Sequence, residues 1–378
     1  MLQSSLHFRA PRRAWQRSLS PISIAVDYPL LVTILVTAGF GMVVLYSASG
    51  ESTAAMLRQS VRIAAGLSAF FVISQIPPRY MRLWAPWMFV TLLMMLVAVM
   101  LVGDIRGGSQ RWLDFGFVGF QPSEFMKLAV PMMVAWFLHE RTLPPTLGQL
   151  FVLMLIVAVP ALLIFRQPDL GGAIQTVAAG GLTILLAGVS MRLIAGCTIA
   201  GLITAPILWK FYLLEYQRDR LRMFLDPWQD PQDAGYNIIQ SQIAIGSGGT
   251  FGKGWLNGTQ AHLEYLPERS TDFVFAVMGE ELGFVGLVCL LLLYLILIGR
   301  GLYIAAQAQD TFTRLLAGSL SLTFFFYVFV NAGMVSGLLP VVGVPLPLVS
   351  AGGTSMVTLM AGFGILSAIS RHRNLLTP

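Results

Sequence analysis

The apolar residues of this chain fall in blocks of about twenty, and these blocks restrict the fold more than any other feature. A helix of about twenty apolar residues crosses a hydrocarbon core of about 30 Å. No block alternates apolar and polar residues as a barrel strand does. The sequence therefore predicts an all-α integral membrane protein with ten transmembrane helices, at residues 29–48, 60–76, 83–102, 122–138, 149–165, 170–189, 192–212, 274–298, 315–336 and 347–369.

Charged residues are scarce in this chain, which excludes several classes of protein. Of the 378 residues, 56% are hydrophobic and 11% are charged, whereas an ordinary soluble domain carries about 25% charged residues. A soluble enzyme, a disordered chain and a disulfide scaffold are excluded, and Cys197 and Cys289 both lie inside apolar blocks. The net charge of +6 comes from basic residues that mostly flank these blocks, so it predicts a membrane topology and no nucleic-acid partner.

Arginines between the blocks predict the orientation of the chain. Ten spans place both termini on one side of the membrane. If that side is cytoplasmic it holds twelve arginines, against four in the opposite short loops, in agreement with the positive-inside rule. We expect one polytopic domain over residues 1–378, with residues 1–28 as a cytoplasmic tail ahead of a retained signal anchor.

Two segments on the opposite side, 103–121 and 213–273, are too long to be simple turns. Loops of this length usually carry function. We expect the second to be a large extracytoplasmic loop between spans seven and eight. Its apolar residues predict short amphipathic helices on the membrane surface, namely Leu221, Phe224, Leu225, Ile238, Ile239, Ile243 and Ile245.

Glu124 and Lys127 are the clearest pair of ionisable residues at the end of an apolar block. Pro122 and Ser123 are typical of a helix start, and a spacing of three places both charges on one helix face. Charges in a membrane span are costly and usually functional. Two interpretations stay open: an ion pair that offsets its own burial, or a pair that lines a polar cavity opening outward.

A glycine-rich segment runs from Gly246 to Gly254 and is similar to a phosphate-binding loop without matching it. Ser247 and Gly254 stand where the Walker pattern requires Gly and Ser or Thr. A flexible loop is one interpretation. The other is that its backbone N–H groups and Lys253 approach a diphosphate.

Three acidic residues surround the start of the eighth span. Thr271 or Asp272 is placed to cap the helix, which is one interpretation of Asp272. Glu280 and Glu281 lie about two turns deeper, where capping cannot explain them. A carboxylate at such a mouth suits a general base.

Prolines and glycines predict two breaks in the helical pattern. Pro168 and Asp169 are predicted to begin the next helix after a tight turn. The stretch 342–355 contains two prolines and a Gly-Gly pair, a combination tolerated in membranes where the backbone is buried or lines a cavity. The scattered histidines show no metal-ligand spacing. Up to this point a membrane enzyme and a transporter both remain open.

The motifs, taken together, resemble the SEDS family (shape, elongation, division and sporulation), and most closely its members for cell elongation. They occur in the family's order over nearly the whole chain. The resemblance rests on Arg111-Trp112-Leu113, Gln121-Pro122-Ser123-Glu124 with Lys127, Pro168-Asp169-Leu170-Gly171, Tyr236 to Ser241, Gly246 to Gly254, Gly258-Thr259-Gln260, Leu266-Pro267-Glu268 with Thr271-Asp272-Phe273, Gly279 to Gly283 and Pro345 to Ser355. Gly172 and Ala351 depart from residues that are common in relatives.

The resemblance implies a peptidoglycan glycosyltransferase that polymerises lipid II at the outer face of the bacterial cytoplasmic membrane, beside a class B penicillin-binding protein of the elongation machinery. It implies that Asp272 is the catalytic residue and that Glu124 and Lys127 are required. By chemistry, Lys127, Arg111 and Lys253 are candidates to stabilise the leaving diphosphate. Ser123 and Glu280 complete the expected substrate-binding residues. A divalent cation suits a diphosphate, although no ligand cluster predicts one.

The sequence leaves three other functions open. The first is a lipid II flippase, which belongs to a different class. The second is a non-catalytic scaffold for a transpeptidase. The third is the division-specific relative, against which the short N-terminal tail and compact C-terminus argue.

Overall fold

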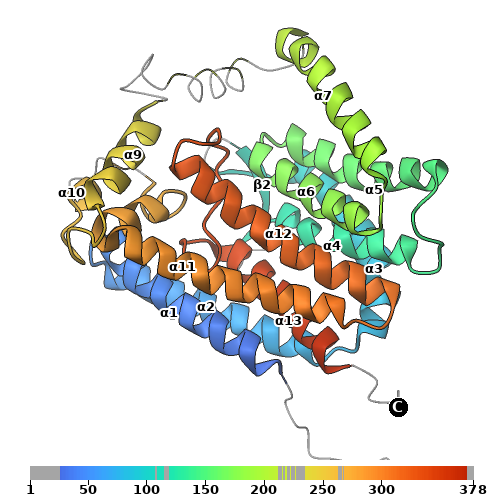
Figure 1. Ribbon diagram of the computed structural model, residues 1–378, viewed down its shortest axis with the longest axis horizontal. Helices are drawn as coiled ribbons and strands as arrows, with labels where there is room; N and C mark the ends of the chain where they lie inside the picture. Colours follow the sequence, from blue (N-terminus) through green and yellow to red (C-terminus); the bar gives the residue numbers. More distant parts are fainter. Residues whose placement is uncertain are drawn as a thin grey trace, which may run out of the picture.

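The computed structural model describes residues 26–106, 109–114, 119–211, 235–262 and 268–372, together with residues 215, 218, 222, 226 and 266. Each of the ten predicted spans overlaps one helix in these ranges, although several helices begin or end some residues away from the predicted bounds (Figure 1). They are α1 (Tyr28–Ala48), α2 (Thr53–Ser74), α3 (Pro78–Val102), α4 (Pro122–Leu138), α5 (Leu147–Arg166), α6 (Leu170–Leu186), α7 (Met191–Phe211), α11 (Val274–Ala306), α12 (Thr311–Val335) and α13 (Gly353–Arg371).

Seven of the described helices are long and apolar enough to cross a membrane, namely α1, α2, α3, α5, α11, α12 and α13. Helix α6 is apolar but shorter. Burial divides the seven: α12 is 72% and α13 is 67% buried over its most apolar window, whereas α2 is only 17% buried. Helices α12 and α13 therefore form the centre of the bundle, and α2 presents most of its apolar surface outward.

Packing joins helices that are far apart in the sequence. Helix α2 packs against α13, α11 packs against α1 and α12, and α4 contacts α3, α6 and α12. Helix α7 projects away from the other helices (Figure 1). The core of the bundle is thus built around α4, α12 and α13, where the candidate site lies.

The segment 103–121 departs from the all-α prediction. It contains three short antiparallel strands in the order β1-β2-β3, namely β1 (Asp104–Arg106), β2 (Ser109–Asp114) and β3 (Gly119–Phe120). A segment outside the helices must pair its backbone polar groups in another way, and these strands pair them with one another. Arg111 lies on β2.

Two helix starts can be compared with the prediction. Asp169 caps α6 by accepting a hydrogen bond from Gly172 N at 2.9 Å, so the predicted turn is confirmed. Helix α13 begins at Gly353, although the predicted span began at 347. Pro345 and Pro347 lack the N–H group that a helix interior needs, and an irregular segment therefore precedes the helix.

Part of the expected extracytoplasmic loop is described. Leu221, Phe224 and Leu225 lie outside the described residues. The four isoleucines fall in α9 (Tyr236–Gly248), which packs its Ile238 and Ile239 side chains against the bundle and leaves Ile243 exposed. The helical prediction is therefore confirmed for this half. A short helix, α10 (Thr259–His262), follows.

The start of α1 and the end of α13 lie side by side. Asp27 N donates to Ser367 Oγ at 3.0 Å, and the Asp27 carboxylate accepts from Ser370 Oγ at 2.6 Å. Arg300 of α11 completes the contact through an ion pair of 2.7 Å with Asp27. These contacts place the start of α1 and the end of α13 at the same end of the bundle.

Candidate functional site

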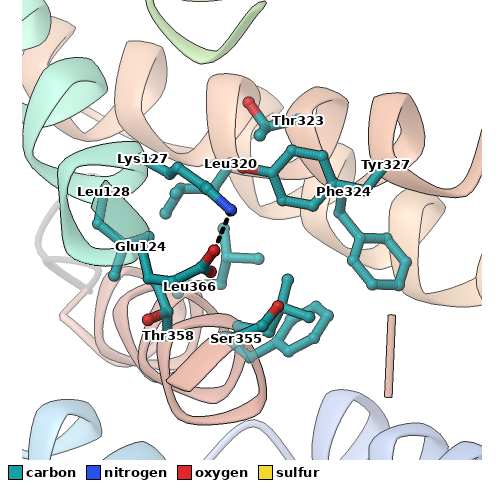
Figure 2. A pocket seen from close by; sticks show the side chains of 13 residues that line it. Glu124, Lys127, Leu128, Leu320, Thr323, Phe324, Tyr327, Ser355, Thr358 and Leu366 are labelled. Carbon is teal, nitrogen blue, oxygen red and sulfur yellow. Dashed lines mark hydrogen bonds and ion pairs between the residues drawn. The ribbon is translucent and has the colours of Figure 1, made fainter. Parts of the chain in front are cut away.

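Glu124 and Lys127 lie in the first two turns of α4 and form an ion pair, with 2.6 Å between Lys127 Nζ and Glu124 Oε1. Both side chains are largely buried, at 12% and 6% exposed. They line a cavity of about 40 Å³, which is room for one to a few water molecules. Figure 2 shows the pair facing α12 and α13 across it. The pair is buried, as the first interpretation expects, and it lines a small cavity, whose opening outward stays a prediction.

Polar side chains of α12 and α13 complete this cavity, and the sequence analysis did not assign them to the site. They are Thr323, Tyr327, Ser355 and Thr358. Lys127 Nζ lies 5.7 Å from the centre of the Tyr327 ring, within the range of a cation–π contact. The signal was present in the sequence, because Thr323, Tyr327 and Asn331 recur every four residues in an apolar helix and so share one face.

Several buried hydroxyl and amide oxygens near this site have no hydrogen-bond partner within the described part of the chain. They are Ser123 Oγ, Thr323 Oγ1 and Asn331 Oδ1. Buried polar groups are almost always paired, so each exception calls for an explanation. Of these three atoms, Thr323 Oγ1 belongs to a residue that lines the cavity, where it offers a partner to water or a polar ligand.

Asp272 lies two residues before α11 and is not its cap, contrary to one interpretation from the sequence. The N-cap residue is Phe273, and no side chain caps this helix. The Asp272 carboxylate instead lies beside the irregular segment before α13, where a Cβ atom on Gly343 would be 3.4 Å from Oδ2. Asp272 does not line the cavity of Glu124 and Lys127.

The backbone around Asp272 is held from two sides. Asn331 Nδ2 donates to Asp272 O at 2.9 Å and to Val344 O at 2.7 Å, so one buried amide joins the two segments. Ser350 Oγ donates to Thr271 O, and Ala351 N donates to Ser270 O at 2.9 Å. Since Tyr327 and Asn331 lie one turn apart on α12, this helix connects the cavity with Asp272.

Glu280 and Lys253 contact each other, although the sequence analysis assigned both to substrate. Lys253 Nζ lies 2.7 Å from Glu280 Oε1, and Glu280 is fully buried. The same carboxylate accepts from Thr259 Oγ1 and Gln260 N at 2.9 and 3.1 Å. These bonds use most of its acceptor capacity, so Glu280 holds the glycine-rich segment onto α11.

The glycine-rich segment also packs closely on a kink of α11 through its backbone. Gly252 and Gly283 have φ angles of +80° and +65°. A Cβ atom on Gly252 would lie 2.1 Å from Glu281 O, so only glycine fits there. Lys253 N and Gly254 N also donate to Glu280 O and Glu281 O at 2.9 and 3.0 Å, so the segment is held against the kink of α11.

Arg111 reaches from β2 to the turn before α6. Its guanidinium donates to Gln167 O at 3.4 Å and to Pro168 O, and it lies 3.6 Å from Asp169 Oδ1. Arg111 therefore fixes the turn that Asp169 caps. Its side chain is 30% exposed, which leaves part of it open to solvent.

Within the described residues, no group of three or more His, Cys, Asp or Glu side chains has the geometry of a metal site. The side chains present thus do not form a resident metal centre, and we derive no step through a metal.

Comparison with known proteins identifies relatives over nearly the whole chain. A family model described as cell cycle protein, covering FtsW, RodA and SpoVE, matches residues 28–375. The peptidoglycan glycosyltransferase MrdB of Escherichia coli (strain K12) is 51% identical over 354 residues, which are 94% of this chain and 96% of that protein.

Solved structures share the fold. A chain from a peptidoglycan synthase complex that coordinates polymerization and crosslinking is 31% identical, with a TM-score of 0.82 over 93% of this chain and 99% of that one. The rod shape determining protein RodA of Thermus thermophilus is 27% identical, with a TM-score of 0.70 over 94% of this chain and 100% of that one. The fold described above is therefore that of a RodA-like protein.

Proposed function

The chain belongs to the FtsW, RodA and SpoVE family of cell cycle proteins, and on that premise we propose that it polymerises lipid II into glycan strands with Asp272 as the general base. It is a peptidoglycan glycosyltransferase of the membrane. We further propose that the chain crosses the membrane ten times and that both termini are cytoplasmic, in addition to lipid II as the substrate and Asp272 as the catalytic residue. The elongation role follows the likeness to a rod shape determining protein, and we propose the outer face as the place of the site.

The placement of Asp272 is the observation that carries the catalytic assignment. Its backbone is fixed by Asn331 and by the segment before α13, while the helix start needs no cap from it. A carboxylate oriented in this way suits proton transfer in a fixed geometry. The acceptor sugar hydroxyl would lose its proton to Asp272 as its oxygen attacks C1 of the donor sugar, and the C1–O bond to the diphosphate would break.

The leaving diphosphate gains negative charge in this step and requires cationic groups nearby. Lys127 is buried among apolar side chains, where a charge acts more strongly than in water. We assign it, with Glu124 orienting its ammonium group, to stabilise the reacting substrate. Arg111 and Lys253 are each bound to protein carboxylates or carbonyls, which supports a structural role for both.

The test is polymerisation of lipid II by the purified full chain with a cognate class B penicillin-binding protein. Asp272→Asn preserves shape and removes the base, so we expect a loss of at least about 100-fold. Glu51→Gln is the matched control, because Glu51 is an exposed carboxylate in the turn after α1 and lies outside the site. Normal polymerisation by Asp272→Asn would refute the catalytic assignment.

The same samples separate the alternative functions. Transport of labelled lipid II across liposomes that persists in Asp272→Asn would favour a flippase. Binding of the transpeptidase without polymerisation by the wild type would favour a scaffold. Depletion in cells is expected to give round cells, and filaments would instead indicate the division role. The structure of the synthase complex supports a transpeptidase partner, which we propose for this chain as well.

A further inference from the structure

We propose that a cleft at the end of the bundle opposite Asp272 binds the phosphate group of an anionic phospholipid. Asp272 precedes the start of α11, whereas this cleft lies where α11 ends and α12 begins. Its volume is about 560 Å³, far more than the roughly 10–15 Å³ that one water molecule needs. The side that holds it is the one we expect to face the cytoplasm.

Two arginines give the cleft its positive charge. Arg79 lines it, and a connected cavity of about 130 Å³ that shares Pro78, Arg79, Asp310 and Thr313 adds Arg82. Arg79 and Arg82 are three residues apart on α3 and share a face. Within the described part of the chain neither forms an ion pair, and Arg79 contacts only the Tyr80 side chain.

The single carboxylate in the cleft does not neutralise these arginines. Asp310 accepts a hydrogen bond from Thr313 N at 2.9 Å and caps α12. His372 also lines the cleft, and its Nδ1 lies 2.9 Å from Ala368 O. Two guanidinium groups therefore remain for an incoming anion, and their planar forks suit the oxygens of a phosphate.

Arginines at a cytoplasmic membrane edge also follow from the positive-inside rule, which needs only charge near the surface. The positive-inside rule does not require that the arginines line a cleft between helices, as they do here. Arg82 is half-buried and Arg79 is exposed, and both arginines line the half-open space between α3 and α12. Basic pockets between membrane helices on this side are typical binding sites for anionic lipid headgroups.

An apolar groove next to the cleft favours a lipid over a free phosphate. Ile369 of α13 and His372, which follows that helix, line the cleft. Ile365, one turn before Ile369 on the same face, lines an apolar groove of about 610 Å³. Trp84 lines that groove one turn beyond Tyr80, and both aromatic side chains are exposed. Such residues mark the headgroup level of a bilayer. A molecule with an anionic headgroup and apolar chains matches both the basic cleft and the apolar groove.

The experiment uses the full chain purified in detergent with phosphatidylglycerol or phosphatidylcholine added at equal mole fraction. Native mass spectrometry counts bound lipid, and thermal unfolding reports Tm. We expect phosphatidylglycerol to bind and to raise Tm by several degrees, and phosphatidylcholine to do neither. Equal binding of both lipids would overturn the proposal, as would equal stabilisation by millimolar inorganic phosphate, which would identify a soluble phosphate as the ligand.

Variants locate the site. Arg79→Gln with Arg82→Gln should weaken phosphatidylglycerol binding at least about tenfold, since two charge-assisted contacts are lost. Arg314→Gln is the matched control, an exposed arginine in the first turn of α12 that does not line the cleft. Arg79→Lys with Arg82→Lys retains the charge and should keep part of the binding. Unchanged binding in the double glutamine variant would refute the assignment to this cleft.

Discussion

Two of the ion pairs in the described part of the chain, Asp27 with Arg300 and Glu124 with Lys127, have surroundings that differ sharply. Asp27 and Arg300 join the start of α1 to α11, and every oxygen of Asp27 is used: Oδ1 accepts from Leu30 N and Arg300 Nε, and Oδ2 accepts from Arg300 Nη2 and Ser370 Oγ. Glu124 and Lys127 share one contact of 2.6 Å beside a cavity. Buried hydroxyls of Ser123 and Thr323 near them lack partners within the described residues.

The two ion pairs differ in their spare hydrogen-bonding capacity. A saturated network fixes one geometry and has no capacity left for a ligand. A pair with spare hydrogen-bonding capacity next to a cavity is costly unless something binds there for part of the time. The Asp27 pair therefore stabilises the packing of α1, α11 and α13, and we propose that the Glu124 pair serves the reaction.

The largest expected effect comes from neutralising the Glu124 pair. We expect Glu124→Gln or Lys127→Met to lower polymerisation of lipid II by about 100-fold or more, because a positioned charge acts on the developing diphosphate. Each single variant also leaves a buried charge unpaired, which costs on the order of 3 kcal/mol of stability.

The double variant Glu124→Gln with Lys127→Met distinguishes the two contributions. It leaves no unpaired charge, so the unfolding temperature should recover toward that of the wild type while polymerisation stays low. Near-normal polymerisation by the double variant would show that this pair, like the Asp27 pair, is only structural.

The second prediction concerns the saturated pair. Asp27→Asn still caps α1 but loses the ion pair with Arg300, and we expect a loss on the order of 3 kcal/mol in stability. Polymerisation per folded molecule should change little. Thermal unfolding in detergent and the lipid II assay measure the two quantities, with Ser370→Ala as a milder control that removes one hydrogen bond, worth about 1 kcal/mol. A variant with normal Tm and no activity would contradict the division between the two pairs.

The sequence predicted those structural features that depend on residues close together in the chain. The spans follow from windows of about twenty apolar residues, and Asp169 as a cap follows from its place beside Pro168. The sheet at 104–120 was not predicted, because it depends on pairing between strands in a short polar segment. Lys253 and Glu280 were both recognised as unusual, yet their mutual contact joins residues 27 positions apart and required the fold.

The residues around the cavity show the same limit of prediction from sequence. Glu124 and Lys127 share a helix, so their pairing was readable from a spacing of three. The side of α12 that faces them could not be predicted. Thr323 and Tyr327 stand out in an apolar helix, but the sequence does not indicate which neighbouring helix they contact. Only packing of α4 against α12 and α13 decides that.

The third prediction tests the connection from α12 to Asp272. Asn331→Leu keeps similar volume and removes both amide donors, which leaves Asp272 O and Val344 O unpaired. We expect kcat to fall about tenfold with a smaller change in KM, because the base is less well positioned while the substrate still binds. Ser336→Ala, one turn farther along α12, removes only a bond within the helix end and is the control. An equal loss in both variants would indicate general destabilisation.

The smallest effect is a dependence of stability on pH at the saturated pair. Burial alone would raise the pKa of Asp27, but hydrogen bonds from Arg300, Ser370 and Leu30 N, with the charge of Arg300, hold it below its usual value of 3.8. A carboxyl group with a lowered pKa adds stability that is complete above 3.8 and is lost as the pH falls through its folded value. Between pH 7 and pH 5 the Tm difference between wild type and Asp27→Asn should therefore stay constant, and it should shrink below about pH 4. A difference that shrinks already near pH 6 would assign the titration to another group.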